Sequence, residues 1–274
     1  MRKKIFSSIL SIGLVFFVVS VSLAVGPEKA KSSSQRFLQT LKVAEKGDKQ
    51  AQYNVGTIYE SGSAEDNVPP DLKKAREWYE KAAAAGHTAA RNSVAVMYYH
   101  GMAGLSVDVK KAVSLFEKSA AEKDPVGTFM LGSIYYKGAP GVEKDVKKGV
   151  ELIKTASDQG NPQAQDEIGV MYFNGENGYP RDRKQAEELY LKSAKAGYVP
   201  AQVHLGTLYY YGSTGVEKDE DKAVAWMKKA AQSGSEEAWK FLEMWSGGEV
   251  KKREETIELK KGVGPAPVAP QVVK

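Results

Sequence analysis

Cysteine is absent from the 274 residues of this chain. No disulfide, zinc–thiolate site or thiol nucleophile can therefore be proposed. The histidines His87, His100 and His204 are far apart and form no His-x-x-x-His pair, and we interpret them as surface or packing residues. No Gly-x-Ser-x-Gly motif, phosphate-binding loop or dinucleotide fingerprint occurs either. The sequence therefore gives no signal for catalysis, a metal or a cofactor.

Positively charged residues outnumber negatively charged ones only slightly. The 39 basic and 34 acidic residues leave a formal net charge of +5, of which the N-terminal Arg2, Lys3 and Lys4 contribute three. A protein that binds nucleic acid needs a clustered basic surface, and the remaining charges show no such cluster. The sequence therefore argues against a nucleic-acid partner.

A single long uncharged stretch, residues 5–25, follows the basic N-terminus. Ser22-Leu23-Ala24 supplies small residues at the two positions that a signal peptidase reads, so residues 1–24 are predicted to be an export signal peptide. Residues 5–25 are also about long enough to span a bilayer, so a retained membrane anchor is the alternative. We expect a periplasmic or secreted protein or, with an uncleaved signal, one anchored in the inner membrane and facing the periplasm.

A 37-residue period runs from Ala51 to Gly234, with one longer loop in the first copy. Each copy opens with a small residue, which we number position 1. The position-1 residues are Ala51, Ala90, Gly127, Ala164 and Ala201. Position 5 is aliphatic, position 6 is small, position 9 is tyrosine and position 12 is glycine in every copy. A fixed period in this range indicates stacked repeats, because no single unit can bury its own apolar face.

Two helices are predicted in each copy. Positions 1, 5 and 9 share one face of the first helix, and the glycine at position 12 ends it. The small residue at position 6 predicts the close approach of a neighbouring helix. An aspartate precedes each second helix, and we interpret it as the N-cap rather than as a metal ligand or catalytic acid. These aspartates are Asp71, Asp108, Asp145, Asp182 and Asp219.

The segments outside the repeats have distinct compositions. Residues 25–34 are polar and small and predict a linker, and residues 35–50 predict an N-terminal capping helix. The five repeats occupy residues 51–237, and residues 238–246 predict a C-terminal capping helix. Residues 247–274 are charged and then rich in proline and valine, which is typical of a disordered tail.

The motif A-x-x-x-L-G-x-x-Y-x-x-G, followed by G-V-x-x-D-x-x-K-A-x-x-W-Y-x-K-A-A-x-x-G, resembles the Sel1-like repeat, a relative of the tetratricopeptide repeat. The resemblance covers Ala51 to Gly234. It implies an all-α, right-handed superhelical solenoid of antiparallel helix pairs, whose first helices line the inner surface. Bacterial members of the family are typically exported or membrane-associated adaptors. The chain departs from the motif at Ala95, Lys123 and Gly149, which affects local geometry.

Three functions follow from these features. The favoured one is a non-enzymatic adaptor that binds a protein or peptide partner in the concave groove, with neither cofactor nor metal. Stacked tyrosines could instead bind peptidoglycan or another glycan. A cysteine-rich branch of the family has been linked to β-lactam binding and weak hydrolysis, but its paired cysteines are missing here, which weakens that transfer.

A row of aromatic residues is the candidate binding site. If positions 1, 5 and 9 are buried, positions 3, 7 and 10 are expected to point away from the buried face. Aromatic residues there would suit the capture of a peptide or helix, because they are enriched at interaction hot spots. A ladder of rings packed between repeats gives the same pattern, so both interpretations stay open. The candidates are Tyr53 and Phe129 at position 3, and Tyr99, Tyr136, Phe173 and Tyr210 at position 10.

Overall fold

The computed structural model describes residues 27–245 of the chain, with the side chains of residues 35–245. Within this range the regular structure is α-helical throughout. The helices are α1 (Pro27–Glu45), α2 (Lys49–Ser61), α3 (Leu72–Ala84), α4 (Thr88–His100), α5 (Val109–Ala121), α6 (Pro125–Lys137), α7 (Val146–Asp158), α8 (Pro162–Asn174), α9 (Arg183–Lys195), α10 (Val199–Tyr211), α11 (Glu220–Gln232) and α12 (Glu236–Trp245).

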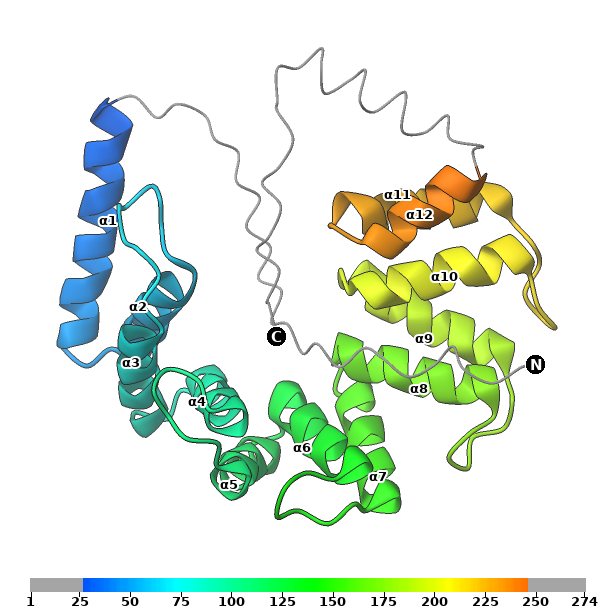
Figure 1. The fold of residues 1–274 in the computed structure, drawn as a ribbon, viewed down its shortest axis with the longest axis horizontal. Helices are drawn as coiled ribbons and strands as arrows, with labels where there is room; N and C mark the ends of the chain where they lie inside the picture. Colours follow the sequence, from blue (N-terminus) through cyan, green and yellow to red (C-terminus); the bar gives the residue numbers. More distant parts are fainter. Residues whose placement is uncertain (1–26, 246–274) are drawn as a thin grey trace.

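The helices form an open arc from α1 at one end to α11 and α12 at the other (Figure 1). Helices α2 to α11 form five pairs, one pair in each repeat, and the first helices of the pairs are α2, α4, α6, α8 and α10. Helices α4 and α6 lie on the inner side of the arc, and α5 and α7 lie on its outer side (Figure 1). The all-α solenoid predicted from the period is confirmed.

Each second helix begins at the aspartate expected to cap it. The Oδ1 atom of Asp145, for example, accepts a 2.9 Å hydrogen bond from the backbone nitrogen of Lys148. This bond satisfies an N–H group that has no partner within the helix. The aspartates that accept such bonds are Asp71, Asp108, Asp145, Asp182 and Asp219.

The small residue at position 6 lies where the two helices of a repeat are closest. A Cβ atom added to Gly56 would lie 2.5 Å from the ring of Tyr79, and one added to Gly206 would lie 2.7 Å from Cγ of Met227. Both Tyr79 and Met227 are fully buried at the centre of their second helices. A large side chain on the second helix therefore fills the space that position 6 leaves, as the sequence predicts.

The departures from the motif have local explanations. Lys123 has a φ of 60°, which is the left-handed conformation that glycine supplies after the other second helices. Gly149 replaces the alanine of the other copies, and a Cβ atom there would lie 2.5 Å from the backbone nitrogen of Tyr136. Helices α6 and α7 are therefore too close at this point to accept alanine without a shift.

The N-terminal helix differs from the expectation. Helix α1 begins at Pro27, within residues 25–34, where the sequence predicted a linker, and it ends at Glu45 rather than at residue 50. Proline suits the first turn of a helix, because its missing N–H would have no partner there and its φ is already near the helical value. Apolar side chains of α1 pack against α2, so the helix covers the N-terminal end of the solenoid.

At the C-terminal end, α12 begins two residues before the predicted capping helix of residues 238–246. Its Ala238 and Leu242 are buried against α11 and α10. The predicted signal peptide, residues 1–24, and the predicted tail, residues 247–274, lie outside the described residues. Across residues 27–245, no helix combines the length and the apolar composition needed to cross a bilayer.

Candidate partner-binding surfaces

Position 3 of the first helices is directed into the solenoid, contrary to the expectation. Phe129 is 9% exposed and belongs to the core that joins the second, third and fourth repeats. Each first helix packs against its own second helix and against both neighbouring repeats, so its buried arc is wider than positions 1, 5 and 9. The prediction that Phe129 faces the groove is therefore wrong. The other buried residues at position 3 are Asn92, Asp166 and Val203.

Tyr53, at position 3 of the first repeat, is half-buried. Its ring stacks on His87 with 4.5 Å between ring centroids and lies 5.6 Å from the ring of Tyr79. Burial raises the pKa of the Tyr53 hydroxyl, and the charge of Glu60 raises it further. This ring therefore packs between the first two repeats.

Position 10 is half-buried in every repeat, and two of its tyrosines contact the next structural unit. The Oη atom of Tyr136 accepts a 3.0 Å hydrogen bond from Asn177, in the loop of the following repeat. The ring of Tyr210 stacks on Trp245 of α12, with centroids 4.1 Å apart and planes 11° from parallel. Both contacts support the packing interpretation that the sequence left open.

The remaining members of position 10 have local partners. The guanidinium carbon of Arg183 lies 3.6 Å from the ring centroid of Phe173. Glu60, the one position-10 residue that is not aromatic, accepts a 2.6 Å hydrogen bond from the hydroxyl of Tyr79. Tyr99 contacts the adjacent His100 edge to face, at 4.9 Å. Part of each half-buried ring stays accessible, so a binding role for Tyr99, Tyr136, Phe173 and Tyr210 stays a prediction.

The most exposed row of the first helices is position 11, about 100° around the helix from position 10. Its residues, all exposed, are Ser61, His100, Lys137, Asn174 and Tyr211. Tyr211 has 65% of its surface exposed. Positions 4 and 7 share this side of the helix, although Met130 and Ser133, which occupy them in the third repeat, are buried. Position 7 carries only Thr, Val or Ser. We call positions 4, 7 and 11 of the first helices the open face.

A histidine and an aspartate meet between the fourth and fifth repeats. The Nδ1 atom of His204 lies 2.7 Å from Oδ1 of Asp166, and the imidazole lies 4.9 Å from the ring of Tyr190. Burial alone lowers the pKa of His204, but the charge of Asp166 and its hydrogen bond outweigh burial, so the pKa is raised. Burial raises the pKa of the neighbouring Glu167 and Tyr198. The site therefore favours the imidazolium.

The junction between the first and second repeats holds a histidine in different surroundings. The Nδ1 atom of His87 accepts a 3.2 Å hydrogen bond from the backbone nitrogen of Ala90 and so caps α4. Its Nε2 atom lies 3.1 Å from Oε1 of Gln50. Burial lowers the pKa of His87, and the positive charge of Lys49 lowers it further. This site therefore favours the neutral imidazole.

Sequence reasoning missed both histidine sites, because it compared residues that are close in the sequence. His204 and Asp166 are 38 residues apart, and His87 and Gln50 are 37 residues apart. A period of 37 places such residues side by side on adjacent repeats. The period itself was therefore the signal that could have found them.

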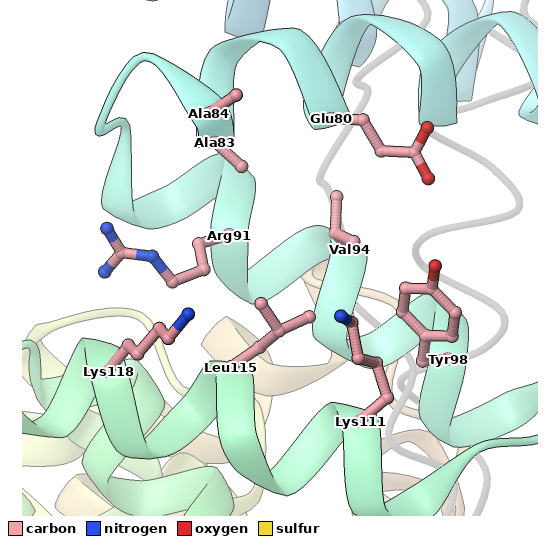
Figure 2. A pocket seen from close by; sticks show the side chains of 9 residues that line it. All are labelled: Glu80, Ala83, Ala84, Arg91, Val94, Tyr98, Lys111, Leu115 and Lys118. Carbon is pink, nitrogen blue, oxygen red and sulfur yellow. The ribbon is translucent and has the colours of Figure 1, made fainter.

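A pocket of about 360 Å³ opens between α3, α4 and α5 (Figure 2). Its lining combines basic and apolar side chains with one acidic residue. Those that matter most for its chemistry are Glu80, Arg91, Val94, Lys111, Leu115 and Lys118. Elsewhere in the described part of the chain, no three acidic or histidine side chains come together in a group that could hold a metal ion.

Comparisons with known proteins agree on the architecture. The family model described as Sel1 repeat matches residues 49–87, 88–124, 125–161, 162–198 and 199–235. A crystal structure of a Sel1 repeat protein from Oxalobacter formigenes is 28% identical with a TM-score of 0.60, covering 75% of this chain and 86% of that chain.

Two further solved structures share the fold. The protein c5321, a protective antigen of uropathogenic Escherichia coli strains with an SLR fold, is 29% identical with a TM-score of 0.51, covering 75% of this chain and 50% of that chain. The immunity protein Pa5087 from Pseudomonas aeruginosa is 23% identical with a TM-score of 0.52, covering 69% of this chain and 67% of that chain, and indicates the fold alone. The comparison with curated protein sequences gives no match.

Proposed function

Because the chain belongs to the Sel1 repeat family, whose solenoids generally serve as protein-interaction scaffolds, we propose that it is a non-enzymatic adaptor for a protein or peptide partner. The proposed binding surface is the open face. The observation that carries the proposal is the exposed row at position 11, which presents one side chain from each repeat. Such a row lets an extended partner contact successive repeats in register.

The composition of the open face supports this role. The residues at position 7 are small or β-branched and, apart from the buried Ser133, half-buried, so they would leave room for the main chain of a partner. Position 11 changes from His100 to Lys137, Asn174 and Tyr211 along the arc, so each repeat offers different chemistry. Specificity would then come from the order of these side chains, while the repeated backbone supplies the shape.

Tyr211 is the residue expected to contribute most, because it is a large, exposed aromatic side chain. The partner is first captured from an envelope extract and identified. Its affinity for purified variants of the protein is then measured. Truncating a hot-spot residue commonly costs about 2 kcal/mol or more, so Tyr211→Ala should weaken binding by about 30-fold with an unchanged melting temperature. Lys192→Ala, on an exposed second-helix position, is the control. Equal affinities of the two variants would contradict the assignment of the open face.

The position-10 rings are proposed to form one edge of the groove. Tyr136→Ala separates their two possible roles, because the Tyr136 hydroxyl accepts a hydrogen bond from Asn177 of the next repeat. If the ring packs between repeats, the substitution should lower the melting temperature. If the ring binds the partner, the substitution should lower the affinity and leave the melting temperature unchanged. An affinity equal to that of the unmodified protein would remove Tyr136 from the groove.

Export is part of the proposal and rests on residues 1–24. Mass spectrometry of the native protein should find a mature chain that starts at Val25. An intact N-terminus in the membrane fraction would instead support the inner-membrane anchor.

Glycan binding and β-lactam hydrolysis, the two competing functions, would each give a different experimental result. Binding of purified muropeptides that Tyr211→Ala abolishes would make a glycan the ligand of the open face. Turnover of a chromogenic β-lactam by the purified protein would contradict the non-enzymatic assignment.

A further inference from the structure

The pocket between α3, α4 and α5 faces away from the proposed partner surface. Helix α4 contributes Arg91, Val94 and Tyr98 to it, which are positions 2, 5 and 9 of the second repeat. These positions lie on the opposite side of the helix from positions 4, 7 and 11 of the open face. A ligand in this pocket would therefore leave the open face free.

The pocket has an apolar centre between charged ends. Val94 and Leu115 line its middle, with Lys111 beside them (Figure 2). Arg91 and Lys118 lie at one end, and Glu80 lies at the other (Figure 2). The three cations outnumber the two nearby carboxylates, those of Glu80 and of Glu122, which pairs with Arg91. The pocket therefore has a net positive charge, although the repeats as a whole are close to neutral.

Arg91 is a buried charge that is fixed in place. It is 9% exposed, and its Nη1 atom lies 2.8 Å from Oε2 of Glu122. The same oxygen accepts a 2.7 Å hydrogen bond from Thr88. The bond from Arg91 is the main reason that the pKa of Glu122 is lowered. By contrast, neither Lys111 nor Lys118 has an ion-pair partner among residues 35–245.

The other repeats show what is particular to this pocket. Position 2 is glutamine or threonine in the first, third, fourth and fifth repeats, and Arg91 is the sole cation at that position. Gln202 donates a 3.3 Å hydrogen bond to the carbonyl oxygen of Ala194, on the preceding second helix. Gln52 makes the equivalent 3.1 Å bond to Ala44. The residue at position 2 therefore joins neighbouring helices in the first and fifth repeats, whereas in the second repeat it pairs with Glu122 and lines a cavity.

We propose that this pocket binds an acidic segment of a protein partner, with an aliphatic side chain against Val94 and Leu115 and carboxylates beside Arg91, Lys111 and Lys118. A volume of about 360 Å³ is at the small end of ligand pockets and suits one or two side chains rather than a cofactor. Arginine in a partly desolvated wall pairs well with carboxylates. The site adds a second interaction surface, on the outer side, to the proposed adaptor.

A defined peptide tests the proposal directly. The probe is a fluorescein-labelled, end-capped hexapeptide of alternating aspartate and leucine, titrated with the naturally processed protein and followed by fluorescence anisotropy. We expect saturable binding that the double substitution Lys111→Glu and Lys118→Glu weakens by about tenfold or more. Arg91→Gln, which copies the residue of the fourth and fifth repeats, also removes the ion pair with Glu122, so it is measured at a temperature at which circular dichroism shows the variant to be folded. There it should weaken binding by about threefold or more.

Two controls distinguish the pocket from general charge attraction. Lys192→Glu changes the residue equivalent to Lys118 in the fourth repeat, where position 2 is Gln165, and should leave the affinity within about twofold. A hexapeptide of aspartate alone, and one of asparagine and leucine, should both bind at least about fivefold more weakly than the probe.

The proposal is overturned if the probe fails to bind at about 1 mM, if poly-aspartate binds equally well, or if Lys192→Glu weakens binding as much as the pocket variants. Tyr211→Ala separates it from the open-face proposal. Loss of probe binding in that variant would place the probe on the open face and contradict the pocket, whereas unchanged probe binding leaves the two sites independent.

Discussion

His204 and His87 lie at junctions near opposite ends of the solenoid, in surroundings of opposite charge. Asp166 raises the pKa of His204 against the effect of burial. Lys49 acts together with burial to lower the pKa of His87. Both junctions are built from the same repeat, so the difference comes from residues that the repeat pattern leaves free. The recurring residues of the repeat determine where the helices lie. The residues that vary between repeats determine how the stability of each junction depends on pH.

The two shifts have opposite consequences for stability. A raised pKa means that the folded state holds the proton more tightly than the unfolded chain, so the contribution of His204 is complete below about pH 6.5 and is lost as the pH rises through the folded pKa. A lowered pKa means the reverse, so the contribution of His87 is complete above about pH 6.5 and is lost as the pH falls through the folded pKa. Acid should therefore strengthen the junction between the fourth and fifth repeats and weaken that between the first and second.

The largest effect is expected from removing the ring that packs against His204. Tyr190 is 2% exposed, and its ring fills the space above Gly169. Truncating a buried aromatic residue costs about 3 to 5 kcal/mol, so Tyr190→Ala should destabilise α8 to α10 by about that amount in urea unfolding. Tyr53→Ala removes the half-buried ring that stacks on His87 and should cost less. Equal losses in the two variants would show that burial does not distinguish the junctions.

The scaffold around these rings could be predicted from the sequence, because it depends on residues that recur. Five copies of a capping aspartate and of a small residue at position 6 leave few arrangements of the two helices in a repeat. Helix α1 was placed less well, since it lies outside the period and begins at a proline that also suits a linker. Phe129 was misplaced because periodicity within one helix does not include burial by the neighbouring repeats.

The histidine sites and the pocket depend on residues that occur once. The pairing of Asp166 with His204 joins position 3 of one repeat to position 4 of the next. Predicting it requires the offset between adjacent helices, which the period suggests but does not fix. Arg91 could be recognised as an exception at position 2, but the cavity beside it depends on the spacing of α3 and α5.

A smaller effect is expected from removing the charge that sets the pKa of His204. Asp166→Asn keeps the shape of the side chain while burial of the imidazole remains, so the pKa of His204 should fall. The fall is partial, because Glu237 also raises this pKa. The stability at pH 5 should decrease by about 1 kcal/mol, at the low end for a charged hydrogen bond because His204 is partly exposed, with little change at pH 8. An NMR titration of the imidazole checks the shift, and an unchanged pKa would contradict the role of Asp166.

The smallest effect is expected from replacing His87 with a cap that does not titrate. Asn161 occupies the equivalent position in the fourth repeat, where its Oδ1 atom accepts a 2.9 Å hydrogen bond from the backbone nitrogen of Ala164. His87→Asn should therefore keep the cap of α4 and change the stability at pH 8 by no more than about 0.5 kcal/mol. It should also remove the weakening of α2 to α4 on acidification, because the neutral amide has no proton to gain.

Amide hydrogen exchange, corrected for its intrinsic pH dependence, measures both junctions in the same sample. In the unmodified protein, lowering the pH from 8 to 5 should decrease the protection of backbone amides in α2 to α4 and increase it in α8 to α10. In His87→Asn the first change should disappear while the second remains, because the third repeat lies between the two junctions and they share no side-chain contact among the described residues. If α2 to α4 still lose protection in the variant, another group causes the acid sensitivity, and the contrast between the two histidines does not explain it.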